Sequence, residues 1–150
     1  MSDKYEDKVG SIFLYSHEAH PGEHYPQLTS MAQKLNHARD LRDNLGVTRT
    51  ILIDALDGAC HRAYGSMPNM TWLINRAGTI LYKSDWTDVT SVDRAVEYFL
   101  SVNLRRREGQ PLAPFRVERL DYRVRDMEGF NKGLEHSGPK AVKEFAEAFE

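Results

Sequence analysis

Residues 11–15, Ser-Ile-Phe-Leu-Tyr, form a short apolar run with polar residues on both sides. A run of this kind is typical of a strand buried inside a parallel sheet. The loop that follows, His17-Glu-Ala-His-Pro-Gly-Glu-His-Tyr-Pro26, holds two prolines and one glycine, which break regular structure. Ligands of open α/β sheets bind at the carboxyl ends of the strands. We therefore expect a functional site to begin in this loop.

Strand and helix patterns alternate along the following residues. Ser30 and Gln33 form a capping-box pair that opens a helical pattern, and Gly46 closes it. The apolar stripe expected to face the core of this helix is Met31, Leu35, Ala38, Leu41 or Arg42, and Leu45. We further expect a buried strand at 50–54, a short helix at 58–65, a hairpin of 70–75 with 79–83, a helix at 92–104 and an amphipathic helix at 139–150. This order indicates an α/β fold.

Composition limits the classes of protein to consider. The chain has 150 residues, 41% of them hydrophobic and 28% charged, and a formal net charge of −2, which predicts a globular domain rather than a nucleic-acid binder. No stretch approaches the ~18 apolar residues of a membrane span, and no apolar signal segment opens the chain. Cys60 is the single cysteine, so an intrachain disulfide and a CxxC pair are excluded. We expect a cytoplasmic protein.

The character of the chain changes at Arg105. Prolines and arginines become frequent, and residues 115–124 show patchy strand-like alternation. We therefore expect a core of residues 1–104 and a C-terminal extension of 105–150 that packs on the core or on a second subunit. Seven arginines against three acidic residues in this stretch favour a solvated face with a subunit contact over an anion-binding surface.

Four stretches together resemble the bacterial relatives of the iodothyronine deiodinases. They are residues 13–22, Ile53-Asp54, Arg62-Ala-Tyr-Gly65 and 74–82, and the resemblance runs from about Tyr5 to Leu100. It implies a thioredoxin-like α/β fold. It also implies that Tyr15, Glu18 and His20 resemble the proton-relay cluster of that family.

The resemblance begins beyond the first strand and helix of the family, where its selenocysteine or cysteine nucleophile lies. A histidine and an arginine of the family align with Leu28 and Trp86. We therefore expect an incomplete or rearranged sheet that lacks the first βα unit and its nucleophile. Because the missing strand would lie between 11–15 and 50–54, unpaired backbone groups would remain there. We expect residues 115–124 or a dimer contact to fill the gap, and hence a homodimer.

His20, with Glu18 and Tyr15, is the expected catalytic group. An imidazole can both give and take a proton near neutral pH, and a neighbouring carboxylate can orient its ring. His17, His24 and Trp86 are the expected substrate-binding residues.

The histidines also allow ordinary structural roles. His37 falls on the polar side of its helix, where we expect it to be solvated. His17, His20 and His24, with Glu18 and Glu23, match no strong metal-ligand spacing, so we expect neither a metal nor another cofactor.

Three functions are compatible with these observations. The first is a small-molecule enzyme of specialised metabolism that catalyses an elimination, isomerisation or cyclisation by acid–base chemistry. The alternative is a non-catalytic thioredoxin-like module that binds a ligand or a partner protein. The third is thiol chemistry at Cys60, although a lone cysteine is most often a small buried side chain.

Overall fold

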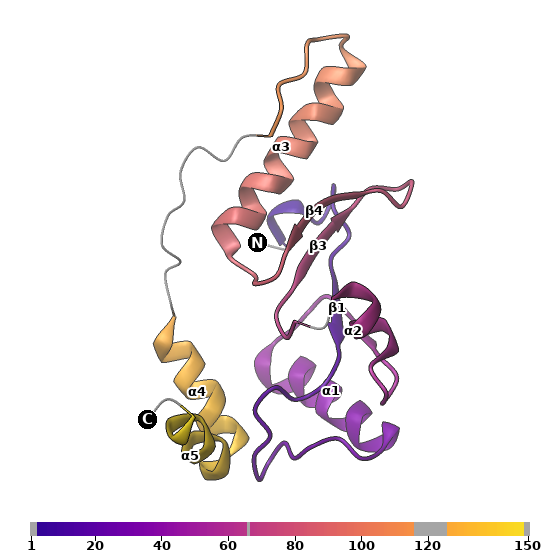
Figure 1. Cartoon of the computed structure of the whole chain (residues 1–150). Helices are drawn as coiled ribbons and strands as arrows, with labels where there is room; N and C mark the ends of the chain where they lie inside the picture. The colour runs from indigo at the N-terminus through magenta and orange to yellow at the C-terminus, as the bar shows by residue number, and fades with distance from the viewer. Residues whose placement is uncertain (1–2, 66, 116–125, 149–150) are drawn as a thin grey trace. The chain divides into compact units, whose positions relative to one another are not determined.

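A computed structural model describes residues 3–65, 67–115 and 126–148 of the chain (Figure 1). It is a mixed α/β structure with two small sheets. The described residues of 2–66 and 125–150 form one compact unit, and those of 67–124 form another. Among the described residues, no helix is long and apolar enough to cross a membrane.

The first unit contains two parallel strands, β1 (Ile12–Tyr15) and β2 (Thr50–Ile53). Both strands were predicted from their apolar runs, and both predictions are confirmed. The strands pair directly, with Ile12 opposite Thr50, and the amide of Asp54 donates to the carbonyl of Tyr15 at 3.1 Å. The prediction that another segment separates them is therefore wrong, because each strand satisfies the facing backbone groups of the other. Residues 116–124 of the expected inserted segment lie outside the described residues.

The predicted helix after the loop is α1 (Met31–Leu45), and it packs against β2. The Ser30 hydroxyl accepts from the Gln33 amide at 3.2 Å, and Gly46 ends the helix with a φ of 66°. The expected core stripe is correct at Ala38, which is buried, and wrong at its two ends. Met31 and Leu35 are exposed, whereas the buried residues of this helix are Lys34, His37 and Ala38.

Three further helices belong to the first unit. The short helix α2 (Ala59–Tyr64) ends at Gly65, where φ is 117°, as its glycine predicted. Helices α4 (Met127–Ser137) and α5 (Pro139–Glu147) form a helical hairpin joined at Gly138. The sequence patterns predicted α5 but not α4. A short 3₁₀ turn, η1 (Asp3–Tyr5), precedes β1.

The second unit contains an antiparallel hairpin and one long helix. Strands β3 (Thr71–Ile74) and β4 (Ile80–Ser84) pair as predicted, with Gly78 at a φ of 81° in the turn. Helix α3 (Val89–Arg107) is capped at its N-terminus by Asp88, whose carboxylate accepts from the Ser91 amide. It continues past the boundary expected at residue 104.

Candidate functional site

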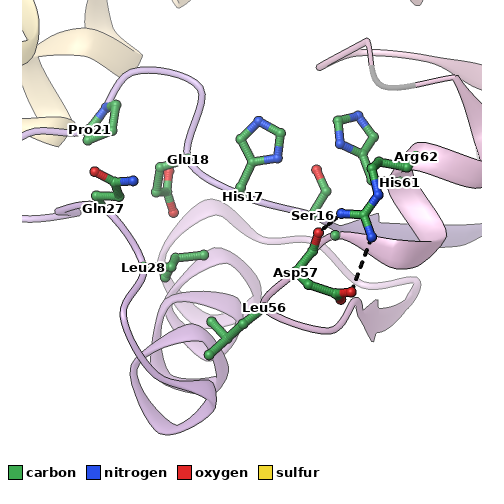
Figure 2. A pocket seen from close by; sticks show the side chains of 11 residues that line it. Ser16, His17, Glu18, Pro21, Gln27, Leu28, Leu56, Asp57, His61 and Arg62 are labelled. Carbon is green, nitrogen blue, oxygen red and sulfur yellow. Dashed lines mark hydrogen bonds and ion pairs between the residues drawn. The ribbon is translucent and has the colours of Figure 1, made fainter.

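A cavity of about 570 Å³ lies in the first unit, where the loops that follow β1 and β2 meet (Figure 2). The carboxyl ends of parallel strands are the usual place for a ligand in an open α/β sheet. A volume of this size suits a small molecule. Its lining residues are Ser16, His17, Glu18, Pro21, Gln27, Leu28, Leu56, Asp57, Gly58, His61 and Arg62.

Glu18 is the lining residue with the strongest set of partners. The Tyr15 hydroxyl, at the end of β1, donates a hydrogen bond to Glu18 Oε1. His37 Nδ1, from α1, lies 3.2 Å from the same oxygen and 3.4 Å from the Tyr15 hydroxyl. An ionised carboxylate only accepts hydrogen bonds, so this arrangement requires the proton of a neutral His37 on Nδ1. A strand end, a loop and a helix thus converge on one carboxylate oxygen.

The second oxygen of Glu18 has different surroundings. No donor among the described residues forms a hydrogen bond with Oε2. The Glu18 side chain keeps 19% of its surface exposed, whereas His37 keeps 9%. Glu18 therefore lines the cavity with one oxygen bonded by protein groups and one that has no hydrogen bond to the described residues.

Tyr15 acts as a fixed donor in this cluster. Its pKa is raised well above the usual value, first because the phenol is buried and then because it donates to the Glu18 carboxylate. A phenol with a raised pKa keeps its proton at neutral pH. Tyr15 is therefore protonated at neutral pH and donates that proton in its hydrogen bond to Glu18.

A second polar group lines the cavity around α2. The rings of His17 and His61 lie 4.9 Å apart at an angle of 52°. The Arg62 guanidinium donates to the backbone carbonyl of Asp57 and, at 3.1 Å, to its carboxylate. Figure 2 shows Glu18 beside Gln27, with His17 between Glu18 and the group formed by His61, Arg62 and Asp57.

Two buried charges support the loop between β2 and α2. Asp54 is 4% exposed, and its carboxylate accepts from the amides of Ala55, Cys60 and His61 at 2.8, 3.0 and 2.8 Å. Burial alone would raise the Asp54 pKa, but these three amides and nearby Lys34 outweigh it and lower the pKa. The amides of Cys60 and His61, in the first turn of α2, therefore already have the Asp54 carboxylate as their acceptor.

Lys34 is the other buried charge. It is 1% exposed, and its ammonium group donates to the Ala55 carbonyl at 3.2 Å. Burial lowers the Lys34 pKa, and the charges of Asp54 and Asp57 partly offset that effect.

The structure does not bring His20 to Glu18. The His20 ring lies edge-on to Phe130 and Phe145, with ring centroids 5.8 and 5.5 Å away. Within the described part of the chain, no hydrogen bond joins His20 to Glu18, and His20 does not line the cavity. The His20 ring lies instead against the C-terminal helices α4 and α5.

The other expected site residues are dispersed. His17 lines the cavity, but His24 Nδ1 instead lies 3.0 Å from the carbonyl of His136. Trp86 belongs to the second unit, where it forms a bridge with Asn69. Cys60 is half-buried and is not a lining residue. Within residues 3–65, 67–115 and 126–148, no three His, Cys, Asp or Glu side chains are grouped to hold a metal ion.

His37 is the residue that the sequence patterns missed. The expectation that it is solvated is wrong, because it is 8% exposed. A signal for it existed in the spacing of Lys34, His37, Ala38 and Leu41, which share one face of the helix. Two of these four are polar, so this face does not form an apolar pattern, and the expected stripe coincides with it only at Ala38 and Leu41.

Comparisons with known proteins give no relative with which this site can be compared. No family model, no curated protein and no solved structure matches the chain.

Proposed function

We propose that this protein is an enzyme that moves a proton on a small molecule, with the Glu18 carboxylate as its base. One observation carries the proposal: Tyr15 and His37 both hold Oε1 of Glu18, while the same side chain lines a cavity large enough for a small molecule. A base held in one orientation needs no rearrangement before it accepts a proton. The Glu18 carboxylate can therefore accept a proton as soon as a molecule binds in the cavity.

The chemistry belongs to the elimination, isomerisation or cyclisation class. Glu18 Oε2 takes a proton from a carbon of the bound molecule, and the electron pair of that C–H bond stays on the molecule. In an isomerisation Glu18 returns the proton to a different atom of the molecule. In an elimination the electron pair forms a C=C bond as the bond to the leaving group breaks, and Glu18 gives its proton to that group. In a cyclisation the electron pair attacks a carbonyl carbon of the same molecule, the π electrons of that C=O move to its oxygen, and Glu18 gives its proton to that oxygen. Tyr15 and His37 are positioning residues, because they act through Glu18.

We further propose that the protein is cytoplasmic and thioredoxin-like and that it has no redox nucleophile. The order of elements supports the thioredoxin-like fold, because a parallel pair of strands with a helix is followed by a short helix, an antiparallel hairpin and a long helix. The single cysteine, half-buried and outside the cavity, supports chemistry that does not depend on a thiol.

Deuterium exchange tests the proposal without knowledge of the natural substrate. The probe is 4-oxopentanoate in D₂O, whose C–H groups beside the ketone exchange slowly on their own. We expect the wild-type chain to accelerate this exchange and Glu18→Gln to lower the acceleration by about 100-fold or more. Glu6→Gln, which changes an exposed glutamate that does not line the cavity, is the matched control.

Each other outcome has a defined meaning. Binding of 4-oxopentanoate without accelerated exchange favours the non-catalytic module. Exchange that survives in Glu18→Gln but is lost in Cys60→Ser favours thiol chemistry. Either result overturns the proposal.

A further inference from the structure

We infer that the cavity binds its molecule by a carboxylate group, and that Arg62 and His17 hold this group at the end away from Glu18. The inference rests on the proposed function, because it names the class of molecule on which Glu18 acts. Figure 2 shows the two ends, with Glu18 near Gln27 and Pro21 on one side and Arg62 on the other.

Arg62 supplies the charge that a carboxylate requires. Its guanidinium is anchored by two hydrogen bonds, both to Asp57. A guanidinium has five N–H groups, so these two bonds leave about three of them for a ligand. The planar fork of such a group matches the two oxygens of a carboxylate. The anchor also fixes the guanidinium in place, so less side-chain freedom is lost when a ligand binds.

His17 supplies a second donor from the opposite loop. Neither of its ring nitrogens forms a hydrogen bond with another described residue, although the ring lines the cavity. The contact with the His61 ring, 4.9 Å away, supports one orientation of the imidazole. Leu28 and Leu56 contribute apolar surface to the same cavity, where the carbon skeleton of a ligand can pack.

The acidic residues of the cavity decide which end an anion occupies. Glu18 and Asp57 are the two carboxylates that line it. Asp57 is already paired with Arg62, whereas Glu18 repels a second negative charge placed near it. The anionic group therefore lies at the Arg62 end, and the reacting C–H lies near Glu18. The class of ligand is a small carboxylic acid whose acidic C–H is separated from the carboxylate by a short carbon chain.

Paired ligands test the charge requirement directly. The two probes are 4-oxopentanoate and its neutral amide, 4-oxopentanamide, and binding is measured by calorimetry or amide NMR titration. We expect the wild-type chain to bind the carboxylate about tenfold more tightly than the amide or better. In Arg62→Met this preference should disappear.

Two further variants complete the test, one that should strengthen the binding of 4-oxopentanoate and one that should leave it unchanged. Asp57→Asn removes the carboxylate that competes for Arg62 but keeps an oxygen for the Ala59 amide, so the affinity for 4-oxopentanoate should rise severalfold. Arg49→Met changes an arginine of a separate cavity of about 380 Å³, and should leave binding unchanged. The folded state of each variant is checked by circular dichroism.

The outcomes separate this inference from the proposed function. Equal affinity for acid and amide, no measurable binding of either, or a preference that persists in Arg62→Met overturns the inference. Exchange on the acid and the amide at equal rates would overturn the inference and leave Glu18 as the base. Selective carboxylate binding without exchange would support the inference and overturn the proposed reaction. Glu18→Gln should keep the carboxylate preference while it loses exchange.

Discussion

Asp54 organises one wall of the cavity, although it does not line it. Its carboxylate binds three backbone amides, and these bonds exist only in the folded chain. Removing the negative charge leaves the amides with a weaker acceptor, so Asp54→Asn should lower the free energy of unfolding by about 2 kcal/mol at pH 7. Urea denaturation monitored by circular dichroism measures this loss.

The same residue predicts a pH dependence with a definite sign. The pKa of Asp54 is lower in the folded chain than the ~3.9 of an unfolded aspartate. Its contribution to stability is therefore complete above about pH 4 and is lost as pH falls through the lower, folded value. The difference in unfolding free energy between wild type and Asp54→Asn should shrink in this acidic range. A difference that stays constant between pH 7 and pH 3 would contradict this role.

At the residue scale, the sequence predicts a site in the loop after β1 but not its full membership. The family resemblance predicted Tyr15, Glu18 and His20 as one cluster, whereas the structure joins Tyr15 to Glu18 and places His20 against Phe130 and Phe145. His37 is 19 residues from Glu18, and its role depends on how α1 rotates about its axis. That rotation follows from where Lys34 and His37 find acceptors, which only the folded chain determines.

At the element scale, the C-terminal helical hairpin docks on the loop after β1 through a close backbone approach. The His24 amide donates to the Ser137 carbonyl at 3.1 Å, and the Lys140 amide lies 2.9 Å from the Glu23 carboxylate. A Cβ atom at Gly22 would lie 2.0 Å from the Ser137 carbonyl oxygen. No side chain fits there unless the backbone of one segment moves.

Gly22→Ala should therefore loosen α4 and α5 from the loop. We expect faster amide hydrogen exchange in α5 and faster cleavage of the C-terminal helices by a protease. Gly10→Ala is the matched control, because a Cβ atom at Gly10 meets nothing within 4 Å. Equal protection of α5 in the two variants would show that this close approach does not hold the hairpin.

The elements with strong local signals were predictable. Helix α1 has a capping serine and a terminal glycine, and β1, β2, β3 and β4 are short apolar runs with polar or glycine boundaries. Helix α4 lacked such a signal because Gly129 and Gly133 lower its intrinsic helix propensity. Its stability depends on tertiary contacts such as that of Phe130 with Phe145 in α5, 4.8 Å between ring centroids.

At the scale of the whole molecule, the direct pairing of β1 and β2 was beyond a sequence-based argument. The expectation of an inserted segment assumed that the spacing of these strands in a thioredoxin-type sheet is retained. Pairing of strands distant in sequence depends on all neighbouring elements, not on the strands alone. The facing backbone groups of β1 and β2 pair with one another along the whole register from Ile12–Thr50 to Tyr15–Ile53.

Homodimer formation remains our prediction for the whole molecule. A two-stranded sheet is marginal by itself, and apolar side chains on both strands are exposed, with Ile12 at 62% and Leu52 at 49%. A second copy would cover such surface. Light scattering after size-exclusion chromatography should give twice the 17.2 kDa mass of the chain at micromolar concentration. A mass of one chain that persists as concentration rises would contradict the dimer.

The central claim, that Glu18 is an oriented base facing the cavity, is tested most directly by carboxylate labelling with glycidol. In this reaction a carboxylate oxygen attacks an epoxide carbon, the C–O bond of the ring breaks, and the alkoxide takes a proton from water, which leaves an ester found by peptide mass mapping. We expect Glu18, although only 19% exposed, to be esterified faster than exposed Glu6, and Tyr15→Phe to slow the labelling of Glu18 alone. Labelling of Glu18 no faster than that of Glu6 would contradict the account.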